Sequence, residues 1–219
     1  MGTVIVAIDG PAGAGKSTVA RAVARRLGFR YLDTGAMYRA LTWLACEREV
    51  DPEDGPALAA LGNANPIELD AERWVRIAGT DVTEAIRLPE IDRLVPLVAR
   101  QPEVRLLMRE RQRELAILGD SVIEGRDIGS VVSPRAEVKV YLVADESVRA
   151  GRRLAERPGV RARALAADMH RRDESDAPQM QRAPDAVLID TTHLSVEQVV
   201  ERVEALVAEI RVTTSGREP

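Results

Sequence analysis

The chain has 219 residues, a net charge of −4 and a hydrophobic fraction of 45%, which suits one compact core. The acidic balance gives no reason to expect wholesale binding to DNA, RNA or an anionic membrane. No apolar run approaches the roughly 20 residues of a membrane span, and the opening residues, interrupted by Asp9, lack the basic region of a signal peptide. The single cysteine, Cys46, excludes an internal disulfide and suits a reducing compartment. We therefore expect a soluble, cytoplasmic protein.

The first 28 residues predict a strand, a glycine-rich loop and a helix. The apolar, β-branched segment TVIVAID, residues 3–9, is typical of a buried strand, and the loop GPAGAGK follows it. The next residues have helical spacing, and their apolar face consists of Val19, Ala20, Val23, Ala24 and Leu27. Gly28 is placed to end this helix.

Strands and helices alternate along the rest of the chain. Short strands are expected at residues 31–32, 120–125, 137–144 and 185–190, and helical segments at 36–49, 88–101, 102–115, 146–173 and 195–210. Ser195 is the expected N-cap of the last helix, whereas Pro96 lies inside a predicted helix, where a proline costs about 3 kcal/mol. Residues 51–66 are rich in Ala, Pro, Gly and Asp, and residues 74–82 alternate like a small antiparallel strand and turn.

Strands separated by helices predict an α/β fold, in which a parallel sheet is covered by helices on both faces. Ligands bind to such sheets at the carboxyl ends of the strands. The glycine-rich loop, DTG at 33–35 and EGRD at 124–127 each follow a predicted strand. We expect these three segments to form one site.

Residues 10–17 match the pattern Gly-x-x-x-x-Gly-Lys-Ser of a phosphate-binding loop, or P-loop. Glycines let successive backbone N–H groups turn toward a phosphate, and the positive end of the following helix adds to the attraction. Lys16 is placed to reach the β- and γ-phosphates of ATP, and the Ser17 hydroxyl to ligate Mg²⁺. The expected ATP-binding residues are Gly10, Pro11, Ala12, Gly13, Ala14, Gly15, Lys16, Ser17 and Thr18. An ordinary glycine-rich turn is the alternative.

The P-loop alone does not name a reaction, because GTPases, motors and transporters use it too. The chain has no Asn-Lys-x-Asp motif for guanine, and it lacks the length and basic surface of a motor or helicase. These exclusions leave a small kinase, whose phosphate acceptor must be inferred from other segments.

Four further motifs occur in order: LDTGAMYR (32–39), PEVR (102–105), EGRDIGSVV (124–132) and RRDESD (171–176). Together with GPAGAGKS they resemble the bacterial cytidylate kinase family over about residues 3–200. The resemblance implies a P-loop nucleoside monophosphate kinase fold in a single domain, 1–219. Its core would comprise about residues 1–50, 103–145 and 184–211, with an acceptor-binding insert at about 51–102, containing a small antiparallel element, and a lid at about 146–183. It also implies a monomer that phosphorylates CMP and dCMP with ATP and Mg²⁺ and has no nucleic acid or membrane partner.

The resemblance also assigns roles to single residues. The implied acceptor ligands are Thr34 and Tyr38 in the pocket wall, Arg39 and Arg126 at phosphate, Asp127 and Arg105 at cytosine, and Arg172 and Asp176 at the phosphate and sugar. In the lid, Arg149, Arg153 and Arg157 are spaced to share one helical face, and Arg153 and Arg157 are the leading candidates to close over ATP. The expected catalytic residues are Lys16, Arg126, Arg172 and Arg157.

Structural alternatives stand beside these roles. Arg39 and Arg105 could be solvated arginines on helices, and Asp33 could cap the helix that begins at Thr34. Glu124 and Asp127 could be loop carboxylates that pair with arginines. Asp33 or Glu124 could also hold the water ligands of Mg²⁺.

The chain departs from the family pattern at two places. A serine that reads cytosine in the family is replaced by Pro96, and an arginine expected three residues after Asp176 is replaced by Gln179. Arg182 could take the place of that arginine. Both departures bear on the acceptor. A related small kinase with another acceptor and a nucleotide-binding regulator without turnover therefore remain alternatives.

Overall fold

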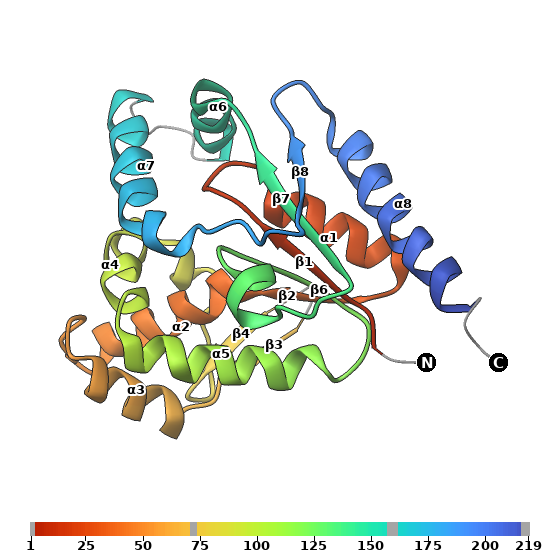
Figure 1. The fold of residues 1–219 in the computed structure, drawn as a ribbon. Helices are drawn as coiled ribbons and strands as arrows, with labels where there is room; N and C mark the ends of the chain where they lie inside the picture. The colour runs from red at the N-terminus through yellow and green to blue at the C-terminus, as the bar shows by residue number, and fades with distance from the viewer. Residues whose placement is uncertain (1–2, 71–73, 157–161, 216–219) are drawn as a thin grey trace. The chain divides into compact units, whose positions relative to one another are not determined.

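The structure is a computed structural model, and it describes residues 3–70, 74–156 and 162–215. The chain forms two compact units: unit 1 is Met1–Tyr31 with Gly119–Pro219, and unit 2 is Leu32–Leu118. Figure 1 shows the elements of both units along the chain. Among the described residues, no helix is long and apolar enough to cross a membrane.

The main sheet has five strands in the order β2-β6-β1-β7-β8. These are β1 (Ile5–Asp9), β2 (Arg30–Asp33), β6 (Ser121–Gly125), β7 (Val138–Val143) and β8 (Val187–Asp190). The pairs β1–β6, β1–β7 and β7–β8 are parallel, and Ile8 lies opposite Glu124 on one side and Val140 on the other. Figure 1 shows β1 in the centre of this sheet. The prediction of a parallel α/β sheet is confirmed.

Two long helices of unit 1, α1 (Lys16–Leu27) and α8 (Val196–Ser215), pack against each other. Their apolar faces join the strands in one core, which includes the fully buried side chains of Val6, Ala20 and Val203. Gly28 adopts φ 69° at the end of α1 and so ends that helix as predicted. Ser195 Oγ accepts from Gln198 N at 3.2 Å while Gln198 Oε1 accepts from Ser195 N at 2.9 Å, which confirms the predicted cap.

The remaining helical elements of unit 1 border the carboxyl ends of the strands. They are the π-helix η2 (Ile128–Val132), α6 (Glu146–Glu156), α7 (Ala162–Asp176) and the 3₁₀ helix η3 (Ala177–Gln179). The helical stretch expected at 146–173 comprises α6 and α7, which contact each other. The π-helix had no signal in the sequence periodicity.

Unit 2 is a layer of helices with a small antiparallel sheet. Its elements are α2 (Thr34–Glu47), α3 (Gly55–Ala64), β3 (Glu68–Leu69), β4 (Val75–Ile77), β5 (Thr80–Asp81), η1 (Ala85–Arg87), α4 (Pro89–Ala99) and α5 (Pro102–Ala116). The strands pair in the order β3-β4-β5, and the β4–β5 turn has positive φ at Ala78 and Gly79. This hairpin confirms the antiparallel element predicted at 74–82.

Unit 2 contains an α-helix that was not predicted, α3, and it confirms the helix predicted at 88–101 as α4. The Ala- and Gly-rich segment contains α3, which begins where the Asp54 carboxylate accepts from Ala57 N at 2.9 Å. Helix α4 continues through Pro96, which lies in its last turn. Ile91, Val95 and Val98 bury the apolar face of α4, and this packing outweighs the unfavourable proline.

Candidate active site

The P-loop follows β1 and has a backbone that its glycines make possible. Gly10 adopts φ 145°, and a Cβ atom there would lie 2.2 Å from the carbonyl oxygen of Leu142. Gly13 adopts φ 77°, and a Cβ atom there would lie 2.9 Å from the carbonyl oxygen of Arg149. Lys16 is the first residue of α1, and its Nζ donates to the carbonyl oxygen of Pro11 at 2.9 Å. The lysine therefore lies back over the loop whose N–H groups are suited to phosphate.

Ser17 and Glu124 form a pair of oxygen ligands suited to a hard cation. Ser17 Oγ donates to Glu124 Oε2 at 2.9 Å, and the Tyr31 hydroxyl donates to Glu124 Oε1. Within the described ranges no group of three or more His, Cys, Asp or Glu side chains could hold a metal. A serine hydroxyl with one nearby carboxylate fits Mg²⁺ that arrives with a nucleotide, since Mg²⁺ keeps several waters and binds substrate phosphates.

Arg126 joins three segments of unit 1 directly after β6. Its Nη1 donates to the carbonyl oxygen of Gly10 at 2.9 Å, and its Nε donates to Asp176 Oδ2 at 2.9 Å. The contact with Gly10 confirms that EGRD and the P-loop meet at one end of the sheet. Asp176, at the end of α7, is 9% exposed, and the neighbouring Asp127 is 8% exposed.

Asp9, the last residue of β1, is a site residue that the sequence reading missed. Its carboxylate accepts from Ile128 N and from Gly129 N, both at 2.8 Å. The pKa of Asp9 is raised to about 6. Burial is the main cause and Asp127 adds to it, whereas the N–H groups of Gly129 and Ile128 and the charge of Lys16 act in the opposite direction. The signal was a charged residue at the end of an otherwise apolar strand.

Helix α6 places one arginine, Arg149, on the P-loop. Arg149 Nη1 donates to the carbonyl oxygen of Ala12 at 3.1 Å and to Asp173 Oδ2 of α7 at 2.5 Å. Arg153 is half-buried on α6. Arg157 lies outside the described residues, and of Arg172 only the backbone, within α7, is described.

The predicted acceptor residues of unit 2 lie on α2 and α5. Thr34 is buried in the first turn of α2, and Tyr38 is half-buried further along it. Arg39 donates to Asp92 Oδ1 of α4 from Nη2 at 3.0 Å and from Nε at 3.3 Å, so it is not simply solvated. Arg105 is half-buried on α5.

The structure also bears on the alternative role of Asp33 and places Gln179 and Arg182. Asp33 accepts from Ala36 N at 2.9 Å and caps α2, as the structural alternative expected. Gln179 lies half-buried in η3, and Arg182 is exposed after it.

A parallel sheet, a P-loop with its lysine and arginines gathered around that loop define a P-loop kinase. A family model described as cytidylate kinase matches residues 6–209, and the chain belongs to that family. A cytidylate kinase of Bacillus licheniformis is 45% identical over 214 residues, which cover 92% of this chain and 95% of that protein. One of Geobacillus kaustophilus is 47% identical over 218 residues, with 93% and 96% covered. The resemblance seen in the motifs is confirmed.

A solved structure supports the fold independently of close sequence similarity. A gluconokinase from Sinorhizobium meliloti superimposes with a TM-score of 0.52 at 13% identity and covers 99% of this chain and 98% of its own. This likeness concerns the fold alone.

Proposed function

We propose that this protein transfers the γ-phosphoryl group of ATP to CMP and dCMP, forming CDP and dCDP. The observation that carries the proposal is membership of the cytidylate kinase family over residues 6–209. The formed P-loop supports it, because Lys16 and Arg126 both lie on carbonyl oxygens of that loop.

The P-loop residues and Arg153 are proposed to bind ATP. The backbone of residues 10–18, in which every residue except Pro11 has an N–H group, would hold its phosphates. Lys16 would exchange its bond with Pro11 for the phosphoryl group that is transferred. Ser17 would ligate Mg²⁺, with Glu124 beside it holding water ligands. When bound, Mg²⁺ neutralises charge on the phosphates.

The acceptor phosphate needs positive charge more than it needs a base. A phosphate monoester has a second pKa near 6, so at neutral pH it is already a dianion and can attack without losing a proton. Two anions must nevertheless approach each other, and arginine side chains suit that task. Arg39, Arg126 and Arg172 are proposed to supply this charge, and Asp176 to bind the sugar once Arg126 turns to phosphate.

The base is proposed to be read by Asp127 and Arg105, with Thr34 and Tyr38 in the pocket wall. A carboxylate accepts from the amino group of cytosine and repels the carbonyl group of uracil. Asp127 is buried, so this discrimination would take place away from bulk water.

The remaining parts of the proposal concern the whole chain. The insert at about 51–102 and the lid at about 146–183, with Arg157 as a catalytic residue of the lid, are proposed to serve a single core. We further propose that the protein is a cytoplasmic monomer without a nucleic acid partner, in line with its net charge of −4.

The test is an assay of ADP release with CMP, dCMP, UMP and AMP as acceptors. The highest kcat/KM is expected for CMP and dCMP. Preference for UMP or AMP would leave a kinase with another acceptor, and ATP binding without ADP release for any acceptor would favour a nucleotide-binding regulator.

A further inference from the structure

The end of strand β1 holds the loop that carries two of the proposed acceptor ligands. Asp9 is 4% exposed and accepts from Ile128 N and Gly129 N at 2.8 Å each. The next residue, Gly10, accepts from Arg126 Nη1 at 2.9 Å. Asp9 and Gly10 thus accept three hydrogen bonds, which hold the backbone that follows Asp127 and the side chain of Arg126, which precedes it.

The two bonds of Asp9 need an ionised carboxylate. Both partners are backbone donors, and each takes a different oxygen, Oδ1 for Ile128 and Oδ2 for Gly129. A protonated carboxyl group, or the amide of an asparagine, offers one acceptor and places a second donor against a backbone N–H. A buried N–H left without an acceptor is costly, and the chain would move to relieve it.

There is little room for that movement without a change at the site. A Cβ atom on Gly129 would lie 3.4 Å from Asp9 Oδ2 and 3.3 Å from the Lys139 side chain, so the Cβ side of Gly129 is closed by these two side chains. Lys139 is itself held, because its Nζ donates to Asp185 Oδ2 and to the carbonyl oxygen of Pro134. Movement of residues 128–129 would therefore be transmitted to Asp127 and Arg126.

We infer that Asp9 is a positioning residue for the acceptor: its carboxylate holds the backbone of residues 128–129 and thereby places Arg126 and Asp127 for phosphate and base. The inference rests on the proposed function of those two residues. It assigns Asp9 no contact with either substrate.

The same contacts give the site a dependence on pH. The charged and titratable groups that act on Asp9 or are acted on by it are Asp127, on the loop after β6, Lys16, at the start of α1, and Tyr141, on β7. The Lys139 side chain lies beside Gly129, as Asp9 Oδ2 does. Burial is the main cause that raises the pKa of Asp9, to about 6. Asp9 is therefore ionised at neutral pH and gains a proton in the range where the phosphate of CMP gains its second one.

The test compares Asp9→Asn with Asp120→Asn as the matched control. Asp120 Oδ1 accepts from Val4 N at 2.8 Å, so it is also an aspartate that holds backbone, at the amino end of the same strand. For Asp9→Asn, kcat/KM for CMP is expected to fall roughly tenfold to hundredfold, as for a lost hydrogen bond to a charged group. The KM for ATP should stay within about twofold, and Asp120→Asn should leave both constants unchanged.

The pH profile supplies a readout that a merely structural role would not change. At saturating ATP, log kcat/KM for CMP in the wild type should approach a slope of two below pH ~6, one proton from CMP and one from Asp9. In Asp9→Asn the slope should approach one. If that variant does not fold, Asp9→Glu, which keeps both carboxylate oxygens on a longer side chain, takes its place: a loss of kcat/KM for CMP without a matching rise in the KM for ATP supports the inference, and equal losses for the two substrates overturn it.

The other outcomes are equally distinct. Normal CMP kinetics in a folded Asp9→Asn, or equal losses for CMP and ATP, would overturn the positioning role while CMP kinase activity stands. No ADP release by the wild type with CMP would remove the proposed function, and the inference with it.

Discussion

Lys16 is one of two lysines in the chain, and it begins α1 with its Nζ on the carbonyl oxygen of Pro11. Lys16→Met should keep the fold and lose nearly all turnover, because stabilisation of charge in the transition state by one group is typically worth about 3–4 kcal/mol. The measurement is kcat together with thermal unfolding.

The other lysine provides the control for that variant. Lys139 is buried on β7 and pairs with Asp185, away from the P-loop sequence. Lys139→Met should lower the unfolding temperature and, because the Lys139 side chain lies against Gly129 beside the proposed acceptor loop, should lower the turnover of the folded protein far less than Lys16→Met does. If Lys16→Met retained most of its kcat, the P-loop kinase mechanism would be wrong.

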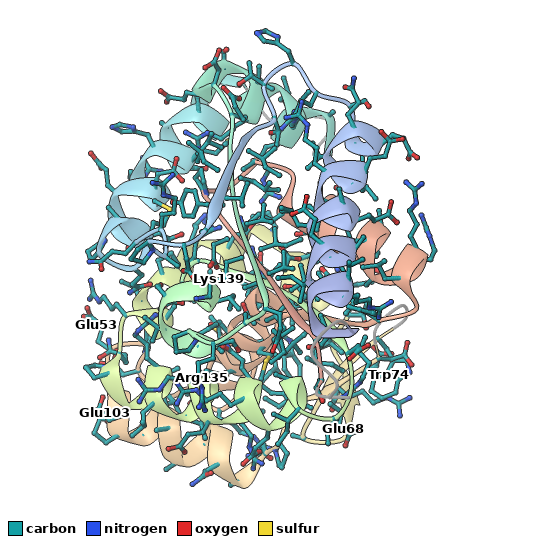
Figure 2. All side chains as sticks on the ribbon, turned by 45° about the vertical axis from the view of Figure 1, so that its right-hand side comes forward. Glu53, Glu68, Trp74, Glu103, Arg135 and Lys139 are labelled. Atoms are coloured by element: carbon teal, nitrogen blue, oxygen red, sulfur yellow. The ribbon has the colours of Figure 1, made fainter. Side chains whose placement is uncertain are left out.

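Arg126 should show a different kinetic pattern, since it is proposed to bridge the donor and acceptor phosphates. In Arg126→Ala, kcat should fall by a larger factor than the rise in KM for CMP, which is typical of a contact made mainly in the transition state. The exposed Arg135, labelled in Figure 2, offers a control in the same unit: Arg135→Ala should behave as the wild type. If Arg126→Ala changed only the KM for ATP, the proposed role of Arg126 at the acceptor phosphate would be wrong.

Asp9 should also make the free energy of unfolding depend on pH. Its pKa in the folded protein, about 6, lies above the ordinary value of 3.8, so the folded state binds the proton more tightly. Its contribution to stability is therefore greatest below pH ~4 and falls as the pH rises toward 6, by up to ~3 kcal/mol. Denaturant unfolding of the wild type and Asp9→Asn between pH 4 and 7 should show this loss in the wild type alone; parallel curves would contradict it.

Among the elements, helix α4 contains Pro96, at the position where the family pattern has a serine that contacts cytosine. Pro96 has neither a side-chain hydroxyl nor an N–H, so it can replace neither the serine hydrogen bond nor a helix bond. Pro96→Ser should increase the preference for CMP over UMP, by the roughly 0.5–1.5 kcal/mol of one neutral hydrogen bond. It should also stabilise α4, with kcat/KM for CMP, dCMP, UMP and AMP and the unfolding temperature as readouts.

The other proline of α4 is a matched control for this substitution. Pro89 occupies the first turn, where a missing N–H removes no helix bond. Pro89→Ser should therefore change neither base preference nor stability by more than a few tenths of a kcal/mol. Equal or better use of UMP or AMP by the wild type would argue against CMP as the preferred acceptor and would leave the assignment as a kinase unchanged.

The contrast between α1 and α3 shows what the sequence could predict at this scale. Helix α1 has a strict apolar face and a closing glycine, both local signals, and its predicted extent is correct. Helix α3 has only Gly55, Leu58 and Gly62 buried, and its Ala- and Gly-rich composition hides the helical period of apolar residues.

The P-loop, a continuous motif, could be predicted residue by residue. The bonds of Asp9 with residues 128–129 join segments 119 and 120 positions apart, and no local pattern records them.

At the scale of the whole molecule, the two ligands should affect the two units differently. The proposed ATP contacts belong to unit 1 alone, whereas the proposed CMP contacts include Thr34, Tyr38, Arg39 and Arg105 of unit 2. A ligand slows hydrogen exchange most strongly where it restricts local opening. A non-hydrolysable ATP analogue should therefore slow exchange in peptides that cover residues 10–27, with little effect on α2 and α5.

CMP alone should slow exchange in α2 and α5 and in residues 124–132, since its proposed ligands lie there. The hairpin at 74–82, which has no proposed contact, is the internal reference for both ligands. Lys16→Met should weaken the effect of the ATP analogue and leave the effect of CMP intact, because the lysine is assigned to the donor. Protection by CMP that is confined to unit 1 would remove the roles proposed for the four residues of unit 2, whatever the assay of ADP release shows.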